Sequence, residues 1–252
     1  MEQANYKCTF SADYFLTPGE CNGEQRMPLW LLVNRIIEVA TLHANSWNAG
    51  YRTLKAKNQA WVLSRVAVEM KEFPPVETRY RLTTWVESYN RHFSERNVEI
   101  ATVDGKILGY ARTIWSIIDT ETREGCDLSA VDAIRENVES ERECPIAKQS
   151  RVRAVEHRRE SRYTFRYSDI DFNRHVNSVH YITLLLDQWP LEHYDSHTLR
   201  RFEIAYMREG YVGEEVTVGV DDAALDNSLA EIVTADGTVL CRARLVFEKN
   251  NQ

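Results

Sequence analysis

Two stretches that match at a fixed offset decide the fold: residues 99–112, EIATVDGKILGYAR, and residues 231–244, EIVTADGTVLCRAR. Eight of the fourteen positions are identical, and each matching pair lies 132 residues apart. The Asp-Gly pair in each stretch signals a two-residue hairpin, because a type I′ turn needs positive φ at both central residues. We therefore expect the same hairpin, with apolar strands on either side, in each half of the chain.

Each half also carries one apolar helix ahead of its strands. In the first half, five apolar residues share one face at helical spacing: Leu29, Leu32, Val33, Ile36 and Ala40. Gly50 is expected to end that helix. In the second half, Asn177 is the expected N-cap and Pro190 follows the end of the helix. The segment between them has little polar surface, so we expect a sheet to wrap around it.

Eight strands are predicted after the two helices. They span Trp61–Met70, Tyr80–Val86, Phe93–Val103, Ile107–Asp119, Arg201–Met207, Glu215–Val220, Leu229–Ala235 and Val239–Glu248. Each half therefore reads as a strand, a helix and then antiparallel strands. This order predicts an α+β fold with a long helix lying in a curled antiparallel sheet. The polar stretch Thr120–Ser150 is expected to connect two domains, residues 1–140 and residues 148–252.

Composition excludes several classes of function. The 252 residues carry a net charge of −7, which argues against general nucleic-acid or membrane-surface binding. No apolar run approaches the ~20 residues that span a bilayer, and Met1–Phe10 has no apolar signal core. The five cysteines are odd in number and scattered, as in a reduced protein, so we expect a cytoplasmic location.

Common catalytic and cofactor motifs are also missing from the sequence. It has no G-x-S-x-G elbow, no G-x-G-x-x-G and no P-loop, which makes an α/β-hydrolase or a nucleotide site unsupported. His175 and His180 are five residues apart and lack an H-E-x-x-H context. We therefore expect no metal and no cofactor.

One polar segment directly precedes the second helix: Asp169–Asn177, DIDFNRHVN. Asp171, Asn173 and His175 occupy alternate positions there, so a carboxylate, an amide and an imidazole can converge on one small volume. The helix start adds free N–H groups and the positive end of the helix dipole, which suit a developing oxyanion. The alternative is a polar loop whose Asp and Asn only cap the helix.

A second candidate is Glu209, at the end of the strand Arg201–Met207. It precedes Gly210, where the absence of a side chain lets backbone approach a ligand closely. The alternative for Glu209 is a solvated carboxylate at the end of a strand.

These residues carry a family resemblance. The run Asp171–Asn177, followed by Tyr181-Ile182, resembles the D-x-N-x-H-V-N…Y-[IL] motif of acyl-acyl-carrier-protein thioesterases. Trp61–Arg65, Tyr80–Trp85 and Ala111–Ser116 resemble that family's N-terminal domain in the same order. The resemblance runs from about Tyr6 to Phe247. Single-domain acyl-CoA thioesterases share a shorter D-x-N-x-H-V-N, so the N-terminal match carries the finer assignment.

The resemblance implies two tandem hot-dog domains, the first binding the acyl chain and the second holding the catalytic residues. By position these are Asp171, Asn173, His175 and Glu209. The implied reaction is hydrolysis of fatty acyl-acyl carrier protein to free fatty acid and carrier protein. Two alternatives remain open: an acyl-CoA thioesterase on the same fold, and an acyl-binding protein without catalysis. A monomer and a homodimer are both compatible with the tandem arrangement.

The expected mechanism uses activated water. Asp171 or Glu209 would act as general base, Asn173 would position the water or the thioester, and His175 would stabilise or protonate the departing thiolate. Backbone N–H groups near Val176 and Asn177 would hold the oxyanion. A transient anhydride on Asp171 is an alternative.

A thiol nucleophile is not expected beside Glu209. Plant members of the family commonly have Cys directly after the Glu, whereas this chain has Gly210. Cys241 lies on a predicted hairpin strand, and we assign it to packing.

The carrier protein itself is acidic, so docking on this acidic chain requires a local positive patch. The stretch Lys148–Arg166 holds seven basic side chains against two glutamates. It lies just before the proposed site, and Arg158 and Arg159 are the predicted docking residues. The alternative is a solvated basic linker.

Overall fold

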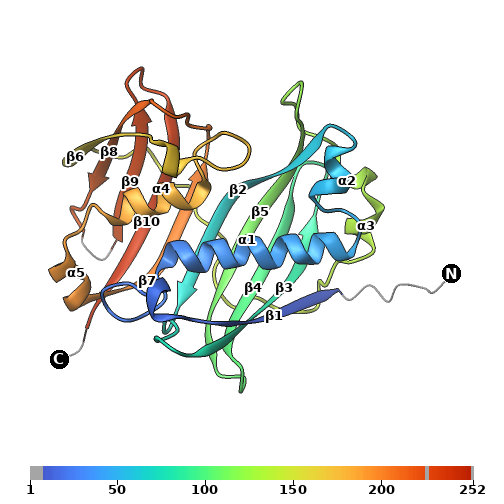
Figure 1. Cartoon of the computed structure of the whole chain (residues 1–252), viewed down its shortest axis with the longest axis horizontal. Coiled ribbons are helices and arrows are strands. Elements are labelled where there is room, and N and C mark those ends of the chain that lie inside the picture. Colours follow the sequence, from blue (N-terminus) through green and yellow to red (C-terminus); the bar gives the residue numbers. More distant parts are fainter. Residues whose placement is uncertain (1–7, 225–226, 251–252) are drawn as a thin grey trace.

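The computed structural model describes residues 8–224 and 227–250. Tyr6, where the family resemblance begins, lies outside the described residues. So do residue 1 and residue 252, the outer limits of the predicted domains 1–140 and 148–252. Ten antiparallel strands form one sheet, in the order β1-β3-β4-β5-β2-β7-β10-β9-β8-β6 (Figure 1). The strands are β1 Thr9–Phe15, β2 Gln59–Met70, β3 Arg79–Tyr89, β4 Ser94–Thr102, β5 Ile107–Asp119, β6 Arg159–Thr164, β7 His197–Tyr206, β8 Glu215–Asp221, β9 Ser228–Thr234 and β10 Val239–Lys249.

Helices are few, and the two longest lie against one face of the sheet (Figure 1). They are α1 and α4, which also contact each other. The α-helices are α1 Leu29–Ser46, α2 Tyr51–Lys55, α3 Asp132–Arg135, α4 Ser178–Leu186 and α5 Leu191–Ser196. Three short 3₁₀ turns add η1 Pro18–Glu20, η2 Leu128–Ala130 and η3 Tyr167–Asp169. Each half therefore has one main helix on antiparallel strands, which confirms the α+β expectation.

Strands β2 and β7 join the two halves into one sheet. They pair antiparallel, with Arg65 opposite Ala205 and Val68 opposite Phe202. A single apolar cluster, which includes Ile36 of α1 and Leu185 of α4, spans both halves. Each fully buried side chain of this kind contributes about 1.5–3 kcal/mol relative to exposure, so the halves stabilise each other through a shared core. Among the described helices, none is both long and apolar enough to cross a membrane.

The repeated stretches form equivalent hairpins, as the sequence predicted. Ile100 pairs with Gly109 in the first hairpin, and Ile232 pairs with Cys241 in the second, which is the same register at an offset of 132. The predicted type I′ turn is wrong, however. Only the glycine of each turn has positive φ (96° at Gly105), and its N–H bonds to the carbonyl three residues earlier. This is a type I turn closed by a glycine bulge.

Two smaller expectations also need correction. Helix α1 ends at Ser46 rather than at Gly50, and Gly50 instead precedes the short helix α2 as its N-cap. The connecting stretch after β5 is mostly irregular, as predicted, although it includes the 3₁₀ turn η2 and the one-turn helix α3.

Candidate active site

The segment before α4 folds into a tight hydrogen-bonded loop. The N–H of Asp171 donates to the carbonyl of His175 at 2.8 Å, and the N–H of Arg174 donates to the carbonyl of Asp171 at 3.0 Å. Oδ1 of Asp171 accepts from the N–H groups of Asn173 (2.8 Å) and His175 (3.3 Å). Arg174 closes the loop with φ at 67°, in the left-handed region.

The structure places the four predicted side chains in two contacting pairs. Nδ2 of Asn173 lies 3.4 Å from Oδ2 of Asp171. Nδ1 of His175 lies 3.3 Å from Oε1 of Glu209, which follows β7. The His175 and Glu209 side chains are 24% and 34% exposed, and Asn173 is exposed. The site is therefore accessible to a substrate. Its two carboxylates, Asp171 and Glu209, are held by their contacts with Asn173 and His175.

The predicted oxyanion role of Val176 and Asn177 does not fit this arrangement. The N–H of Val176 donates to the carbonyl of Gly210 at 2.9 Å, and the N–H of Asn177 donates to the carbonyl of Asp169 at 2.8 Å. Both donors are already used, so neither is free for an oxyanion. Asn177 is the N-cap of α4, as predicted, since its Oδ1 accepts from the N–H of Val179 at 3.2 Å.

Gly210 lies packed beneath the start of α4. Its N–H donates to Oη of Tyr181 at 2.8 Å. A Cβ added at this position would lie 2.9 Å from that oxygen and 3.0 Å from Cε2 of Phe165. Tyr181 is 3% exposed, and burial raises the pKa of its hydroxyl, which therefore stays protonated. A side chain at the residue after Glu209 would therefore require these neighbours to shift.

Cys241 is a core residue, as the sequence predicted. It is fully buried on β10 within the apolar cluster. Burial raises the pKa of the thiol well above its usual range, so the reactive thiolate is suppressed. Nothing in its surroundings suits a nucleophile.

Several residues around the site were missed from the sequence. The guanidinium of Arg123, in the loop after β5, pairs with the carboxylate of Glu209. The ring of Tyr211 stands edge-on to His175, with centroids 5.2 Å apart. Phe172 meets Tyr51 of α2 in the same way at 5.5 Å. Both halves of the chain therefore contribute to the site, although every predicted residue came from the second.

The loop that precedes α1 has the same backbone hydrogen bonds as the candidate site loop. The N–H of Asn22 donates to the carbonyl of Arg26 at 2.9 Å, and the N–H of Arg26 donates to Oδ1 of Asn22 at 2.9 Å. Gln25 has φ at 58°, as Arg174 has at 67°. The N–H of Met27 then donates to the carbonyl of Pro74, as Val176 does to Gly210. The scaffold of the site therefore occurs twice in the chain.

This second loop differs at the four positions that the sequence singled out. By the matching hydrogen bonds, Asn22 corresponds to Asp171, Glu24 to Asn173 and Arg26 to His175. Phe73, directly before Pro74, corresponds to Glu209 in the same way. Since asparagine closes the first loop as well as aspartate closes the second, the loop does not need the negative charge of Asp171. That carboxylate is available for chemistry.

The predicted docking pair at the start of β6, Arg158 and Arg159, does not form a free positive patch. Nε of Arg158 lies 3.0 Å from Oδ1 of Asp221, and Nε of Arg159 lies 2.7 Å from Oδ2 of Asp222. Nη1 of Arg159 also donates to the carbonyl of Gln188. Asp221 and Asp222, at the end of β8, neutralise both charges. The charge count over Lys148–Arg166 did not include them because they lie elsewhere in the sequence.

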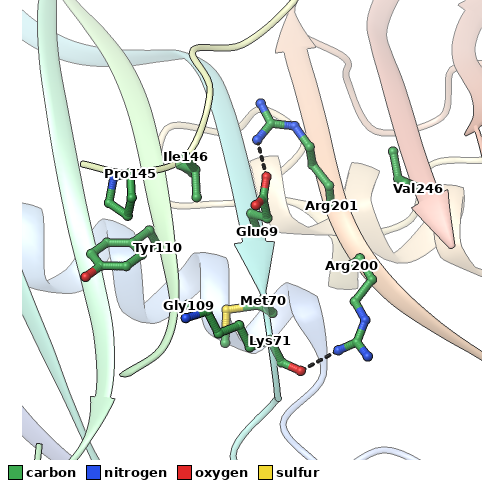
Figure 2. A pocket seen from close by; sticks show the side chains of 10 residues that line it. All are labelled: Glu69, Met70, Lys71, Gly109, Tyr110, Pro145, Ile146, Arg200, Arg201 and Val246. Atoms are coloured by element: carbon green, nitrogen blue, oxygen red, sulfur yellow. Dashed lines mark hydrogen bonds and ion pairs between the residues drawn. The ribbon is translucent and has the colours of Figure 1, made fainter. Parts of the chain in front are cut away.

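A cleft of about 560 Å³ opens on the face of the sheet opposite α1, so that α1 lies behind the strands in Figure 2. Both of its arginines are already bonded: Arg201 bonds Glu69 at 2.7 Å and Arg200 bonds the Lys71 carbonyl. None of the predicted site residues lines this cleft. Within residues 8–224 and 227–250, no cluster of three His, Cys, Asp or Glu side chains is placed to hold a metal ion.

Comparison with known proteins shows the family. Residues 7–135 match the family model for the acyl-ACP thioesterase N-terminal domain, and residues 152–249 match that for the C-terminal domain. A palmitoyl-acyl carrier protein thioesterase of Gossypium hirsutum is 26% identical over 219 residues, which cover 79% of this chain and 52% of that protein. The chain spans about half the length of the chloroplastic relatives that it matches.

Solved structures agree with this match. An acyl-ACP thioesterase from Bacteroides thetaiotaomicron is 34% identical, with a TM-score of 0.89 over 96% of this chain and 98% of that one. The 12:0-ACP thioesterase of Umbellularia californica, 17% identical, shares the fold with a TM-score of 0.83 over 96% of this chain and 98% of that one. The two family models together cover most of the sequence, and the solved structures share its fold. The chain therefore belongs to the acyl-ACP thioesterase family and consists of two hot-dog domains in tandem.

Proposed function

We propose that this protein hydrolyses the thioester of fatty acyl-acyl carrier protein, releasing free fatty acid and carrier protein. Family membership supports the reaction class. The observation that carries the proposal is the contact series Asn173–Asp171 and His175–Glu209 at one partly exposed site. We also propose that the protein is cytoplasmic and that it is a monomer or a homodimer.

Asp171 is the proposed general base. Its Oδ1 is occupied by two backbone N–H groups, whereas Oδ2 has only the long contact to the Asn173 amide. A water bound between Oδ2 and that amide would lose a proton to Asp171 as its oxygen attacks the thioester carbon. The Asn173 amide would also donate to the oxyanion, in place of the Val176 and Asn177 N–H groups.

His175 is the proposed proton donor to the leaving group. Its Nδ1 faces Glu209, so Nε2 is the nitrogen left to face the substrate sulfur. As the carbon–sulfur bond breaks, Nε2 would protonate the thiolate. The proton that Asp171 took from water then returns to His175 through solvent, which restores both groups. One water and one thioester thus give one acid and one thiol.

The division of labour between the domains remains a proposal. We propose that residues 1–140 hold the acyl chain and residues 148–252 hold the catalytic residues. Helix α1 supports the first part, because its buried face is mostly aliphatic, with Leu32, Val33 and Ile36 fully buried. The contact of Tyr51 with Phe172 supports this part further, because it places α2 of the N-terminal domain beside the site loop.

Carrier-protein docking is proposed on the surface that surrounds the site. Six exposed large apolar side chains lie on η3, on the site loop, on α2 and on the segment after β7: Tyr51, Tyr167, Phe172, Met207, Tyr211 and Val212. Tyr167 and Phe172 are 91% and 74% exposed. Exposed aromatic side chains next to a site are typical of a protein interface.

Unpaired cations accompany these apolar residues. Among the described residues, no carboxylate forms an ion pair with the exposed side chains of Arg52, Lys55, Arg166, Arg174 or Arg208. This contrasts with Arg158 and Arg159, which are paired. An acidic carrier can therefore find free positive charge within reach of His175, and such charge mainly raises the association rate.

One comparison tests reaction and partner together. Purified protein should hydrolyse acyl-acyl carrier protein faster than the same acyl group on CoA. Charge reversal of Arg174 and Arg208 to Glu should raise KM for the carrier substrate at low salt and leave acyl-CoA turnover near normal. Arg158→Glu is the matched control, and it should change neither value. Absence of thioester hydrolysis on both substrates would reject the enzyme and favour an acyl-binding protein.

A further inference from the structure

We propose that Arg123, which belongs to the N-terminal domain, is a positioning residue for the active site in the C-terminal domain. This inference rests on the proposed function of Glu209 and His175. Arg123 pairs with the carboxylate of Glu209, and the same oxygen, Oε1, lies 3.3 Å from Nδ1 of His175. The N-terminal domain thereby sets the orientation of the carboxylate that orients the histidine.

The strand order places this arginine beside the site. β5 and β7 are both antiparallel to β2, one on each side of it, so they run in the same direction. Their C-terminal residues, Asp119 and Tyr206, therefore lie toward the same end of the sheet. Strands two places apart are separated by roughly 10 Å, a span that an arginine and a glutamate side chain can close.

The loop that carries Arg123 is held by its own hydrogen bonds. The carboxylate of Asp119 accepts from the N–H groups of Thr122 (2.8 Å) and Glu121 (2.9 Å), and these bonds lower the pKa of Asp119. The N–H of Arg123 donates to the Asp119 carbonyl at 2.9 Å, and the N–H of Thr120 donates to the Asn58 carbonyl at 2.7 Å. The guanidinium is therefore presented from a fixed base.

The pairing also separates the roles of the two carboxylates. Arg123 and His175 both face Oε1 of Glu209, so that carboxylate is held between them and is left to orient His175. Asp171, which has no cationic partner among the described residues, then acts as the base. The Arg123–Glu209 pair is 48% and 34% exposed, and exposed pairs of this kind contribute only about 0–1 kcal/mol to stability. Its effect should therefore appear in kinetics.

A double-mutant cycle tests the inference. Arg123→Ala should lower kcat about tenfold with KM nearly unchanged, and Arg123→Lys should recover part of the loss. In the Glu209→Gln background, Arg123→Ala should cause little further loss, because both changes act through one contact. Arg91→Ala is the matched control, since Arg91 forms a similar exposed pair with Asp127 at 3.2 Å. It should leave kcat unchanged.

A second readout does not depend on turnover. Loss of the guanidinium releases the Glu209 carboxylate that faces Nδ1 of His175, so the NMR signals of the His175 ring should shift in Arg123→Ala. In the Glu209→Gln background, Arg123→Ala should cause no further shift. Wild-type kcat in Arg123→Ala, or fully additive losses in the cycle, would overturn the inference even if the wild-type protein is active. If the wild-type protein shows no turnover, the proposed function fails, and unshifted His175 ring signals would then decide against Arg123.

Discussion

Replacing Gly210 by cysteine, the residue that commonly follows the glutamate in plant members of the family, tests whether this site has room for a thiol. The new Cβ would lie 2.9 Å from Oη of Tyr181, 3.0 Å from Cε2 of Phe165 and 3.1 Å from Cγ2 of Val176. All three residues are at least 94% buried. Each would have to shift within a packed environment to admit the new side chain.

The cost follows from these contacts. Overpacking a filled core costs about 1–3 kcal/mol, and loss of the 2.8 Å bond between the Gly210 N–H and Tyr181 adds about 1 kcal/mol. A total of roughly 2–4 kcal/mol should lower the melting temperature by roughly 5–15 °C. Gly210→Ala should lose nearly as much, because the clash begins at Cβ.

Calorimetry and thioesterase kinetics under reducing conditions provide the assay. Gly19→Ala is the control, since an added Cβ there meets no atom within 4 Å. Gly210→Cys should lose activity and should not become dependent on its thiol. A variant that melts like the wild type, and whose activity is then abolished by iodoacetamide, would refute the packing argument.

The remaining predictions concern the site itself. His175→Ala and Asn173→Ala should each lower kcat by at least ~10² while the melting temperature holds, and near-normal turnover in both would remove the site assignment. Asp171→Asn should keep the loop folded, because asparagine closes the equivalent first loop, yet it should lose more activity than Glu209→Gln; the reverse order would make Glu209 the base. Because burial keeps Cys241 protonated, alkylation of Cys241 should require unfolding even at alkaline pH near 9, which mass spectrometry of labelled protein would show.

Much of the fold could be predicted because it depends on local patterns. The matched hairpins and the two apolar helices needed only spacing along the chain, and β5 was predicted with its observed bounds. The turn type was wrong because Asp104 takes negative φ. The hydroxyl of Thr102 bonds Lys106 across the turn, which favours the bulged turn over type I′.

The site was predictable only where its residues share one loop. Asp171, Asn173 and His175 lie within five residues, and the local turn places all three in one loop that the Asp171 carboxylate closes. Arg123 lies 86 residues from Glu209, and no short motif connects them. Its place depends on β2 pairing with both neighbours. The ion pairing of the predicted docking residues was missed for a related reason, since Arg158 meets Asp221 63 residues away.

The doubled loop has a consequence for how this family can change over evolutionary time. Backbone hydrogen bonds hold both copies in shape, although Asp171 is Asn22 and His175 is Arg26 in the first copy. Asn22 and Asp171 each supply the side-chain oxygen that closes their loop, so that position needs an acceptor, whereas the positions of Arg26 and His175 accept different side chains. One copy of the loop can therefore lack the chemical groups of the site and still keep its structural role. The same freedom makes the loop before α1 a ready place to graft new reactive groups.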